Sequence, residues 1–342
     1  MAKRPAILLI YTGGTIGMIR DAKSGQLKPF NFERLMDEIP ELSKFDLNIQ
    51  SHSFRKPIDS SDMQPEIWME LAHLIEEEYN KYDGFVILHG SDTMAYTASA
   101  LSFMLENLAK PVVLTGSQLP IGTIRTDGKE NLITAIEIAA AKEKGKALVP
   151  EVCVYFEYQL YRGNRTHKFN AEHFRAFESP NYPLLAEAGI SIRYNRGDIE
   201  KPSTKKLKIH TLLDKRIAIL KMFPGITPAV VRAILNAEDV QAIVLESYGS
   251  GNVTTEKWFT EELRAAIKSG KIILNITQCA AGRVEQGRYQ TSAALAEIGV
   301  IGGADMTTEA ALTKLMFLLA NSADMKSVKK QLAQNLRGEM TV

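Results

Sequence analysis

Short runs of aliphatic and β-branched residues alternate along the chain with longer segments whose apolar residues recur at helical spacing. This alternation predicts βαβ units, in which helices flank a mostly parallel sheet. The strand candidates are Ala6–Tyr11, Phe85–Leu88, Val112–Leu114, Val152–Phe156, Ile217–Met222, Ala242–Leu245 and Ile272–Ile276. The clearest helical segments are Pro65–Tyr79, Met94–Leu108 and Thr307–Ala320. The pattern therefore predicts an α/β fold.

The alternation stops between Asn195 and His210, where the sequence becomes polar and is interrupted by Pro and Gly. Such a stretch is typical of a boundary between domains. A second α/β series follows, and its first helix begins with Thr227-Pro228, an N-cap residue followed by proline. We predict a larger domain over residues 1–194, a linker over 195–212 and a smaller Rossmann-like domain over 213–342.

The charge balance argues against a polyanionic partner. The 342 residues include 41 Lys and Arg and 40 Asp and Glu, so the formal net charge is only +1. Proteins that act on nucleic acid or on anionic membranes usually have a basic excess. We therefore expect a small-molecule partner, with no nucleic acid and no membrane.

The cysteines and the N-terminal segment indicate the compartment. Cys153 and Cys279 lie far apart in sequence and give no disulfide framework, which agrees with a reducing compartment. We expect Cys279 to be a small buried residue rather than a nucleophile. The apolar run at Ala6–Tyr11 is too short for a signal peptide, and no stretch approaches the ~20 residues that span a bilayer. We therefore predict a cytoplasmic protein.

Hydroxyl-rich loops follow three of the strand candidates in the first half of the chain. They are Thr12-Gly13-Gly14-Thr15-Ile16-Gly17, His89-Gly90-Ser91-Asp92-Thr93 and Thr115-Gly116-Ser117-Gln118. In open α/β sheets, ligands bind outside the carboxyl ends of the strands. Hydroxyls, free backbone N–H groups and one carboxylate at a helix start suit attack on a carbonyl and stabilisation of the oxyanion.

Each loop alone also has a structural interpretation. The Gly13–Gly17 turn is neither a Walker loop nor G-x-G-x-x-G, and such a turn is more often structural than functional. Ser91 and Asp92 could cap the helix that follows them. The six histidines show no metal-ligand spacing, and no G-x-S-x-G elbow supports a serine-hydrolase triad. We expect no metal and no cofactor.

Several motifs in order make the chain resemble the asparaginase/glutaminase family. The Thr12–Gly17 and His89–Met94 segments are similar to that family's two active-site signatures. Tyr161-Arg-Gly-Asn-Arg-Thr-His-Lys168 and Asp59-Ser-Ser-Asp-Met63 resemble its bacterial type I, cytoplasmic branch. The resemblance runs on through Gly302–Met306 to Asn335–Glu339 and so covers nearly the whole chain. It implies hydrolysis of the L-asparagine side-chain amide to L-aspartate and ammonia.

The resemblance also assigns catalytic roles. Thr15 matches the family's nucleophile, on a loop that closes over substrate, while Ser91, Asp92 and Lys168 match its second hydroxyl, aspartate and lysine. A threonine hydroxyl needs a base. Lys168 can serve only if burial or nearby positive charge, for example from Arg162 or Arg165, lowers its pKa.

Substrate binding is assigned in the same way. Asp92 would pair with the ammonium group of asparagine, and the Ser60–Ser61 segment with Asp59 resembles the part that binds the carboxylate. Without the resemblance, residues 59–62 would be a loop before the helix at Pro65. One methylene in a pocket is worth only ~1–3 kcal/mol, so minor glutaminase activity is expected.

The resemblance further implies a homodimer or a dimer of dimers with sites completed across subunits. The segment Ser247–Asn252 is similar to the part that a neighbouring subunit contributes, which makes Asn252 a candidate contact. An ordinary turn explains this segment equally well.

Two departures from the family pattern keep other functions open. Ser91 stands where the family usually has Thr, and the stretch Asp21–Leu27 lacks the family's lid tyrosine. They motivate an alternative, an amino-acid-binding sensor with little or no turnover. The amidase subunit of a tRNA-dependent amidotransferase shares the motifs but normally has an extra N-terminal domain, whereas here the first strand begins at residue 6.

Overall fold

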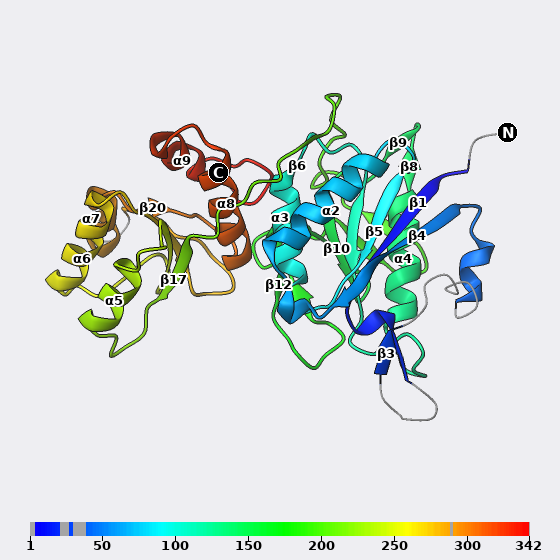
Figure 1. Ribbon diagram of the computed structural model, residues 1–342, viewed down its shortest axis with the longest axis horizontal. Coiled ribbons are helices and arrows are strands. Elements are labelled where there is room, and N and C mark those ends of the chain that lie inside the picture. Colours follow the sequence, from blue (N-terminus) through cyan, green and yellow to red (C-terminus); the bar gives the residue numbers. More distant parts are fainter. Residues whose placement is uncertain (1–3, 21–26, 30–38, 288–289, 342) are drawn as a thin grey trace. The chain divides into compact units, whose positions relative to one another are not determined.

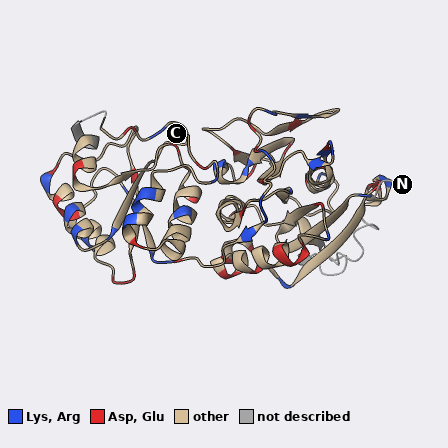
Figure 2. Cartoon of the chain, turned by 90° about the horizontal axis from the view of Figure 1, so that it is seen from above, with Lys and Arg blue, Asp and Glu red and all other residues tan. Residues whose placement is uncertain are grey.

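The computed structural model describes residues 4–20, 27–29, 39–287 and 290–341 (Figure 1). The chain forms two compact units, residues 1–211 and 212–342. Among the described residues, no helix is both long enough and apolar enough to cross a membrane. Figure 2 shows basic and acidic residues interspersed along each unit, as the balanced composition predicts.

The first unit is built on an eight-stranded sheet in the order β15-β14-β11-β10-β7-β5-β1-β4. The strands from β10 to β4 in this order are parallel, and the three at the other edge are antiparallel. Their bounds are β1 Ala6–Gly13, β4 Asn48–Ile58, β5 Gly84–Leu88, β7 Val112–Thr115, β10 Val152–Phe156, β11 Gln159–Arg162, β14 Ala186–Ala188 and β15 Ile192–Tyr194. The mostly parallel sheet predicted from the sequence is confirmed.

Helices cover both faces of this sheet because its central strands are apolar on both sides. All eight residues of β1 are buried. Ile7, Leu9 and Tyr11 share one core with Leu132 and Ile136 of α4 (Gly128–Ala140). Strand residues alternate between faces, and Figure 1 shows α2 (Pro65–Glu78) and α3 (Met94–Met104) on the other side.

Short elements complete the first unit. The paired strands are β2 Met18–Arg20 with β3 Leu27–Pro29, β6 Leu105–Glu106 with β16 Lys208–Ile209, β8 Lys142–Glu143 with β9 Lys146–Ala147, and β12 His167–Lys168 with β13 Phe177–Glu178. The 3-10 turns are η1 Thr15–Gly17, η3 Pro40–Lys44, η4 Ser60–Asp62 and η5 Gly163–Arg165.

The second unit contains a four-stranded parallel sheet in the order β17-β18-β19-β20. Its strands are β17 Ile217–Lys221, β18 Ala242–Ser247, β19 Ile272–Thr277 and β20 Ile301–Gly302, and its helices are α5 Pro228–Leu235, α6 Lys257–Lys268, α7 Gln290–Ile298, α8 Thr308–Asn321 and α9 Met325–Leu332. Thr227 caps α5 by accepting from the Val230 amide, with Pro228 opening the helix, as the sequence predicts.

Two sequence predictions differ from the structure. The helix predicted over Met94–Leu108 ends at Met104, because Leu105 and Glu106 pair with β16. Cys279 is exposed rather than buried.

The predicted linker, residues 195–212, lies almost wholly within the first unit, whose boundary falls after Thr211. Asn195 donates from its side chain to the Leu184 carbonyl, and Ile199 packs on the core that contains Leu9. Lys208 and Ile209 form β16. These contacts attach to the first unit a segment whose composition suggested a linker between domains.

Candidate active site

The three hydroxyl-rich loops meet because β1, β5 and β7 are neighbours and run in the same direction. The Thr12 hydroxyl donates to the Leu88 carbonyl at 3.0 Å, joining the ends of β1 and β5. The His89 amide donates to the Thr115 carbonyl at 2.9 Å, joining the ends of β5 and β7. The loops therefore form one continuous edge at the carboxyl ends of the strands.

Thr15 begins the turn η1 and is half-buried. Gly14 precedes it with φ +89°, and a Cβ at Gly14 would lie 2.4 Å from the Gly90 amide nitrogen. Only glycine fits this positive φ and close approach. As a result, the backbone before Thr15 is in direct contact with the loop that carries Ser91.

Tyr11 supports the same turn from below. Its hydroxyl donates to the Gly17 carbonyl at 3.2 Å, and a Cβ at Gly17 would lie 2.1 Å from the Tyr11 ring. Burial raises the pKa of Tyr11 to about 12, so the phenol remains a neutral donor. Tyr11 thus fixes the backbone that presents Thr15.

Lys168 contacts both Ser91 and Asp92. Its ammonium nitrogen lies 2.9 Å from Ser91 Oγ and 2.5 Å from Asp92 Oδ1. The Lys168 side chain is 14% exposed, whereas that of Asp92 is 63% exposed. Asp92 Oδ2 has no hydrogen-bond partner within the described part of the chain. The Asp92 carboxylate can therefore hold Lys168 and still accept from a second cation.

The segment before Lys168 is fixed by its own hydrogen bonds and by close packing. The Thr166 hydroxyl donates to the Arg162 carbonyl at 2.7 Å, and Lys168 pairs with Phe177 across β12 and β13. A Cβ at Gly163 would lie 3.1 Å from the Ala98 side chain of α3. The close packing of η5 on α3 therefore holds Lys168 against the loop that precedes this helix.

The two arginines near Lys168 in sequence point to other partners. Arg162 forms a buried ion pair with Glu151 at 2.7 Å and stacks over the Tyr182 ring, 4.4 Å from its centroid. Arg165 lies 5.1 Å from the same centroid. These arginines support the turn η5, and the charged group in direct contact with Lys168 is Asp92.

The segment from Asp59 to Ser61 lies against the Ser91 loop. Ser60 is buried, its carbonyl accepts from the Thr93 hydroxyl at 2.7 Å, and a Cβ at Gly90 would lie 2.5 Å from Ser60 Oγ. Asp59 Oδ1 accepts from both the amide and the hydroxyl of Ser61. These hydrogen bonds lower the pKa of the Asp59 carboxyl. Ser61 is therefore oriented by Asp59.

Neither Ser91 nor Asp92 caps the next helix. The N-cap position of α3 is Thr93, whose side chain makes no capping hydrogen bond and instead donates to Ser60. The alternative interpretation of the Ser91-Asp92 pair as a helix cap therefore does not hold.

A buried chain of donors and acceptors lies beneath the loop. Trp68 Nε1 and His89 Nε2 each lie 2.9 Å from the Thr97 hydroxyl, and His89 Nδ1 lies 2.6 Å from the Gly90 carbonyl. A carbonyl can only accept, so Nδ1 carries the proton and Nε2 accepts from Thr97. Burial lowers the pKa of His89 to about 4. This neutral histidine fixes the carbonyl next to Ser91.

Sequence reasoning did not assign Gln118, although it noted the loop. Ser91 Oγ lies 3.4 Å from Gln118 Oε1, and Gln118 Nε2 donates to the His173 carbonyl at 3.0 Å. Asp127 accepts from the backbone amide of Gln118 at 2.9 Å, and burial raises the pKa of the Asp127 carboxyl. The sequence feature that could have indicated Gln118 is its place in the loop after β7, the strand next to β5.

Comparison with known proteins identifies the family. The sequence model described as "Asparaginase, N-terminal" matches residues 6–200, and that of the "Glutaminase/Asparaginase C-terminal domain" matches residues 216–332. Together they cover most of the chain. The chain belongs to the asparaginase family.

Individual relatives agree with this assignment. The chain is 46% identical to L-asparaginase 1 of Escherichia coli K12 over 99% of both proteins. The crystal structure of L-asparaginase I from Vibrio cholerae superposes with a TM-score of 0.91 at 42% identity, covering 99% of this chain and 100% of that one. Mouse 60 kDa lysophospholipase is 40% identical, and the match covers all of this chain and 64% of that protein.

For this asparaginase-family chain, three sequence predictions remain: the stretch without a lid tyrosine, Asn252 and the expectation of no metal. The stretch without a lid tyrosine includes residues 21–26, which lie outside the described residues. Asn252 closes a turn after β18, where its amide donates to the Tyr248 carbonyl at 2.8 Å. Among the described residues, no three His, Cys, Asp or Glu side chains gather closely enough to hold a metal ion.

Proposed function

We propose that this chain hydrolyses the side-chain amide of L-asparagine to L-aspartate and ammonia. The observation that carries the proposal is the contact of Lys168 with both Ser91 and Asp92, beside the glycine turn that presents Thr15. In an asparaginase-family chain, this arrangement supplies a nucleophile, a proton-transfer pair and an anionic binding group.

In the first half of the reaction, Thr15 Oγ attacks the amide carbon and loses its proton. The carbonyl oxygen becomes an oxyanion, which backbone N–H groups of the glycine-rich loops would stabilise. Collapse of this intermediate breaks the C–N bond, and the leaving nitrogen takes up the proton that Thr15 lost and departs as ammonia. A β-aspartyl ester on Thr15 remains.

In the second half, water attacks the ester carbonyl. The contact between Ser91 Oγ and Lys168 Nζ at 2.9 Å provides a route for the proton that water loses. Breaking the ester C–O bond returns the proton to Thr15 and releases aspartate. No cofactor takes part in either half.

Substrate orientation would come from charge. Asp92 Oδ2 can accept from the α-ammonium group of asparagine while Oδ1 holds Lys168. The Ser60–Ser61 segment is proposed to bind the α-carboxylate. Asp59 already accepts from both the amide and the hydroxyl of Ser61. Ser61 must therefore release Asp59 from one of these donors in order to donate to the α-carboxylate.

A substrate panel tests the proposal against an amino-acid sensor. Ammonia release would be measured with L-asparagine, D-asparagine and L-glutamine, and asparagine binding by calorimetry. We expect rapid release from L-asparagine and slower release from L-glutamine. Binding of asparagine without ammonia release would favour the sensor. A lysophospholipid, included because of the mouse relative, should not be hydrolysed.

Subunit assembly and location extend the same proposal. We expect a homodimer or a dimer of dimers, in which Asn252 reaches the site of a neighbouring subunit, and a location in the cytoplasm. Both expectations rest on the resemblance of the sequence motifs to the bacterial type I, cytoplasmic branch of the family.

A further inference from the structure

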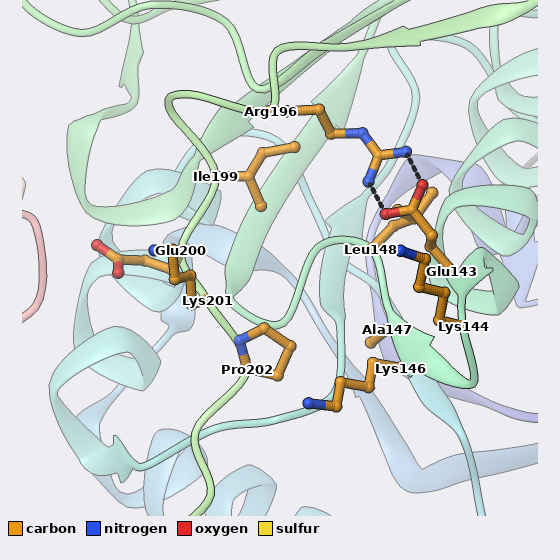
Figure 3. A pocket seen from close by; sticks show the side chains of 10 residues that line it. All are labelled: Glu143, Lys144, Lys146, Ala147, Leu148, Arg196, Ile199, Glu200, Lys201 and Pro202. Carbon is orange, nitrogen blue, oxygen red and sulfur yellow. Dashed lines mark hydrogen bonds and ion pairs between the residues drawn. The ribbon is translucent and has the colours of Figure 1, made fainter.

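A cavity of about 480 Å³ lies in the first unit between the hairpin of β8 and β9 and the segment 196–202 (Figure 3). None of the residues proposed to act on asparagine lines it. Its volume falls within the range of small-molecule sites, about 300–1,000 Å³. The cavity is thus a separate candidate binding site.

The floor of the cavity is apolar and fixed. Leu148 and Ile199 line it and also pack against the core beneath the main sheet. Ala147 and Pro202 add to the apolar lining. The Glu200 amide donates to the buried Glu151 carboxylate at 2.8 Å, which ties the segment 196–202 to the first unit. An apolar ligand group could therefore rest on this floor with little rearrangement.

The charge around the cavity is unbalanced. Its two carboxylates already face arginines: Glu143 forms a two-point pair with Arg196, at 3.0 and 3.3 Å, and Glu200 lies 3.4 Å from Arg162. Figure 3 shows the Glu143–Arg196 pair at one side of the cavity and the Glu200 carboxylate turned away from the other side chains. Glu143 is therefore neutralised by Arg196, whereas Glu200 shares the single charge of Arg162 with Glu151. The lining nevertheless carries four cationic side chains against two carboxylates.

Three lysines remain without such partners. Lys144, Lys146 and Lys201 are exposed and line the cavity. Within the described part of the chain, none of the three forms a hydrogen bond or an ion pair through its ammonium group. Lysine ammonium groups are common ligands of phosphate.

We propose that this cavity binds an organic phosphate, a small anion with at least two negative charges joined to an apolar or planar group. The three lysines would hold the phosphate groups, and Leu148 and Ile199 would contact the apolar part. An excess of cationic side chains, three ammonium groups without a partner among the described residues, and an apolar floor together distinguish this cavity from a surface of scattered lysines.

Calorimetry with adenosine diphosphate as the probe, free of divalent cations, tests the proposal. Inorganic pyrophosphate and adenosine serve as probes of the two halves. We expect adenosine diphosphate to bind most tightly, pyrophosphate to bind more weakly and adenosine to show no detectable binding. Added salt should weaken binding, because exposed charges are screened within ~8–10 Å at ordinary ionic strength.

The decisive variant replaces Lys144, Lys146 and Lys201 together with Gln. It should weaken diphosphate binding at least ~10-fold, since three favourable charge interactions disappear. Its circular dichroism spectrum and its midpoint of chemical unfolding should equal those of the wild type, which shows that the variant is folded. A matched control, with the exposed Lys44, Lys205 and Lys206 replaced by Gln, should bind like the wild type.

Three results would overturn the proposal: no binding of the diphosphate at millimolar concentration, equal binding by the two triple variants, or equal binding of adenosine and the diphosphate. If pyrophosphate binds as tightly as adenosine diphosphate, the proposed role of Leu148 and Ile199 is wrong. These readouts are binding measurements, so they remain interpretable whether or not the proposed asparagine hydrolysis is correct.

Discussion

Lys168 contacts two polar groups that belong to a different sequence motif. Its ammonium group contacts Ser91 and Asp92 at the same time, although Lys168 lies 77 and 76 residues after them in the chain. The resemblance of the motif around residue 168 assigned a catalytic lysine, but the local sequence did not give its position relative to Ser91 and Asp92. Lys168 pairs antiparallel with Phe177, and no local pattern in the sequence revealed that pairing.

Replacement of Lys168 with Met tests its proposed role at the residue scale. We expect kcat for ammonia release to fall by about 10²–10⁴-fold, the usual contribution of a proton-transfer group. Lys205→Met, at an exposed position, serves as the control and should leave kcat unchanged. A Lys168→Met enzyme with kcat within a factor of about two of the wild type would exclude proton transfer by this residue.

His89 predicts a pH dependence of stability. Its pKa in the folded protein, about 4, lies below the ordinary value of 6.5. Between these values the unfolded chain binds more protons, so the free energy of unfolding falls as the pH drops from 6.5 towards 4. The full shift corresponds to about 3 kcal/mol.

Chemical unfolding of the wild type and His89→Gln at pH 7.5 and pH 4.5 measures this effect. The variant should be less stable at pH 7.5, because the contacts with Thr97 and Gly90 change. Its loss of stability on acidification should be smaller than that of the wild type. Equal losses in the two proteins would show that His89 does not titrate as the structure indicates.

At the scale of elements, the sequence predicted best the parts that are buried on all sides. β1 and β10 are continuous apolar runs, and their predicted and observed bounds agree within two residues. β4 was missed, because it lies at the edge of the sheet and most of its residues are exposed. Its alternation is weak, and only its pairing with β1 makes it a strand.

The predicted site residues show the same division. Glycine motifs at Gly14 and Gly90 signalled loops at strand ends, where parallel neighbours bring them together. The contact of Ser91 with Gln118, and the use of Ser61's donors by Asp59, depend on tertiary packing and side-chain rotamers. Neither leaves a periodic signal in the sequence.

The buried ion pair of Arg162 with Glu151 is expected to stabilise β11 and the turn η5. Removing one partner from a buried pair leaves an uncompensated charge and typically costs about 3–5 kcal/mol. Arg162→Met should therefore reduce the free energy of unfolding by this amount, measured by denaturant titration. The double variant Glu151→Gln with Arg162→Met should recover part of the loss, and no recovery would contradict the charge explanation.

At the scale of the whole molecule, the central question is assembly. If Asn252 completes the site of a neighbouring subunit, Asn252→Ala should raise KM for asparagine about 10-fold with a smaller change in kcat, as expected for a lost binding contact. Light scattering should show a dimer or tetramer for both proteins. A fully active monomer would contradict the shared site.

The proposed mechanism requires Thr15 to carry the acyl intermediate. The enzyme would be mixed with L-asparagine, quenched with acid within one turnover, digested and analysed by mass spectrometry. We predict that the peptide containing Thr15 gains the mass of a β-aspartyl group, and that Thr15→Ala shows no such gain and no ammonia release. Label on the Ser91 peptide, or ammonia release by Thr15→Ala at the wild-type rate, would contradict the account.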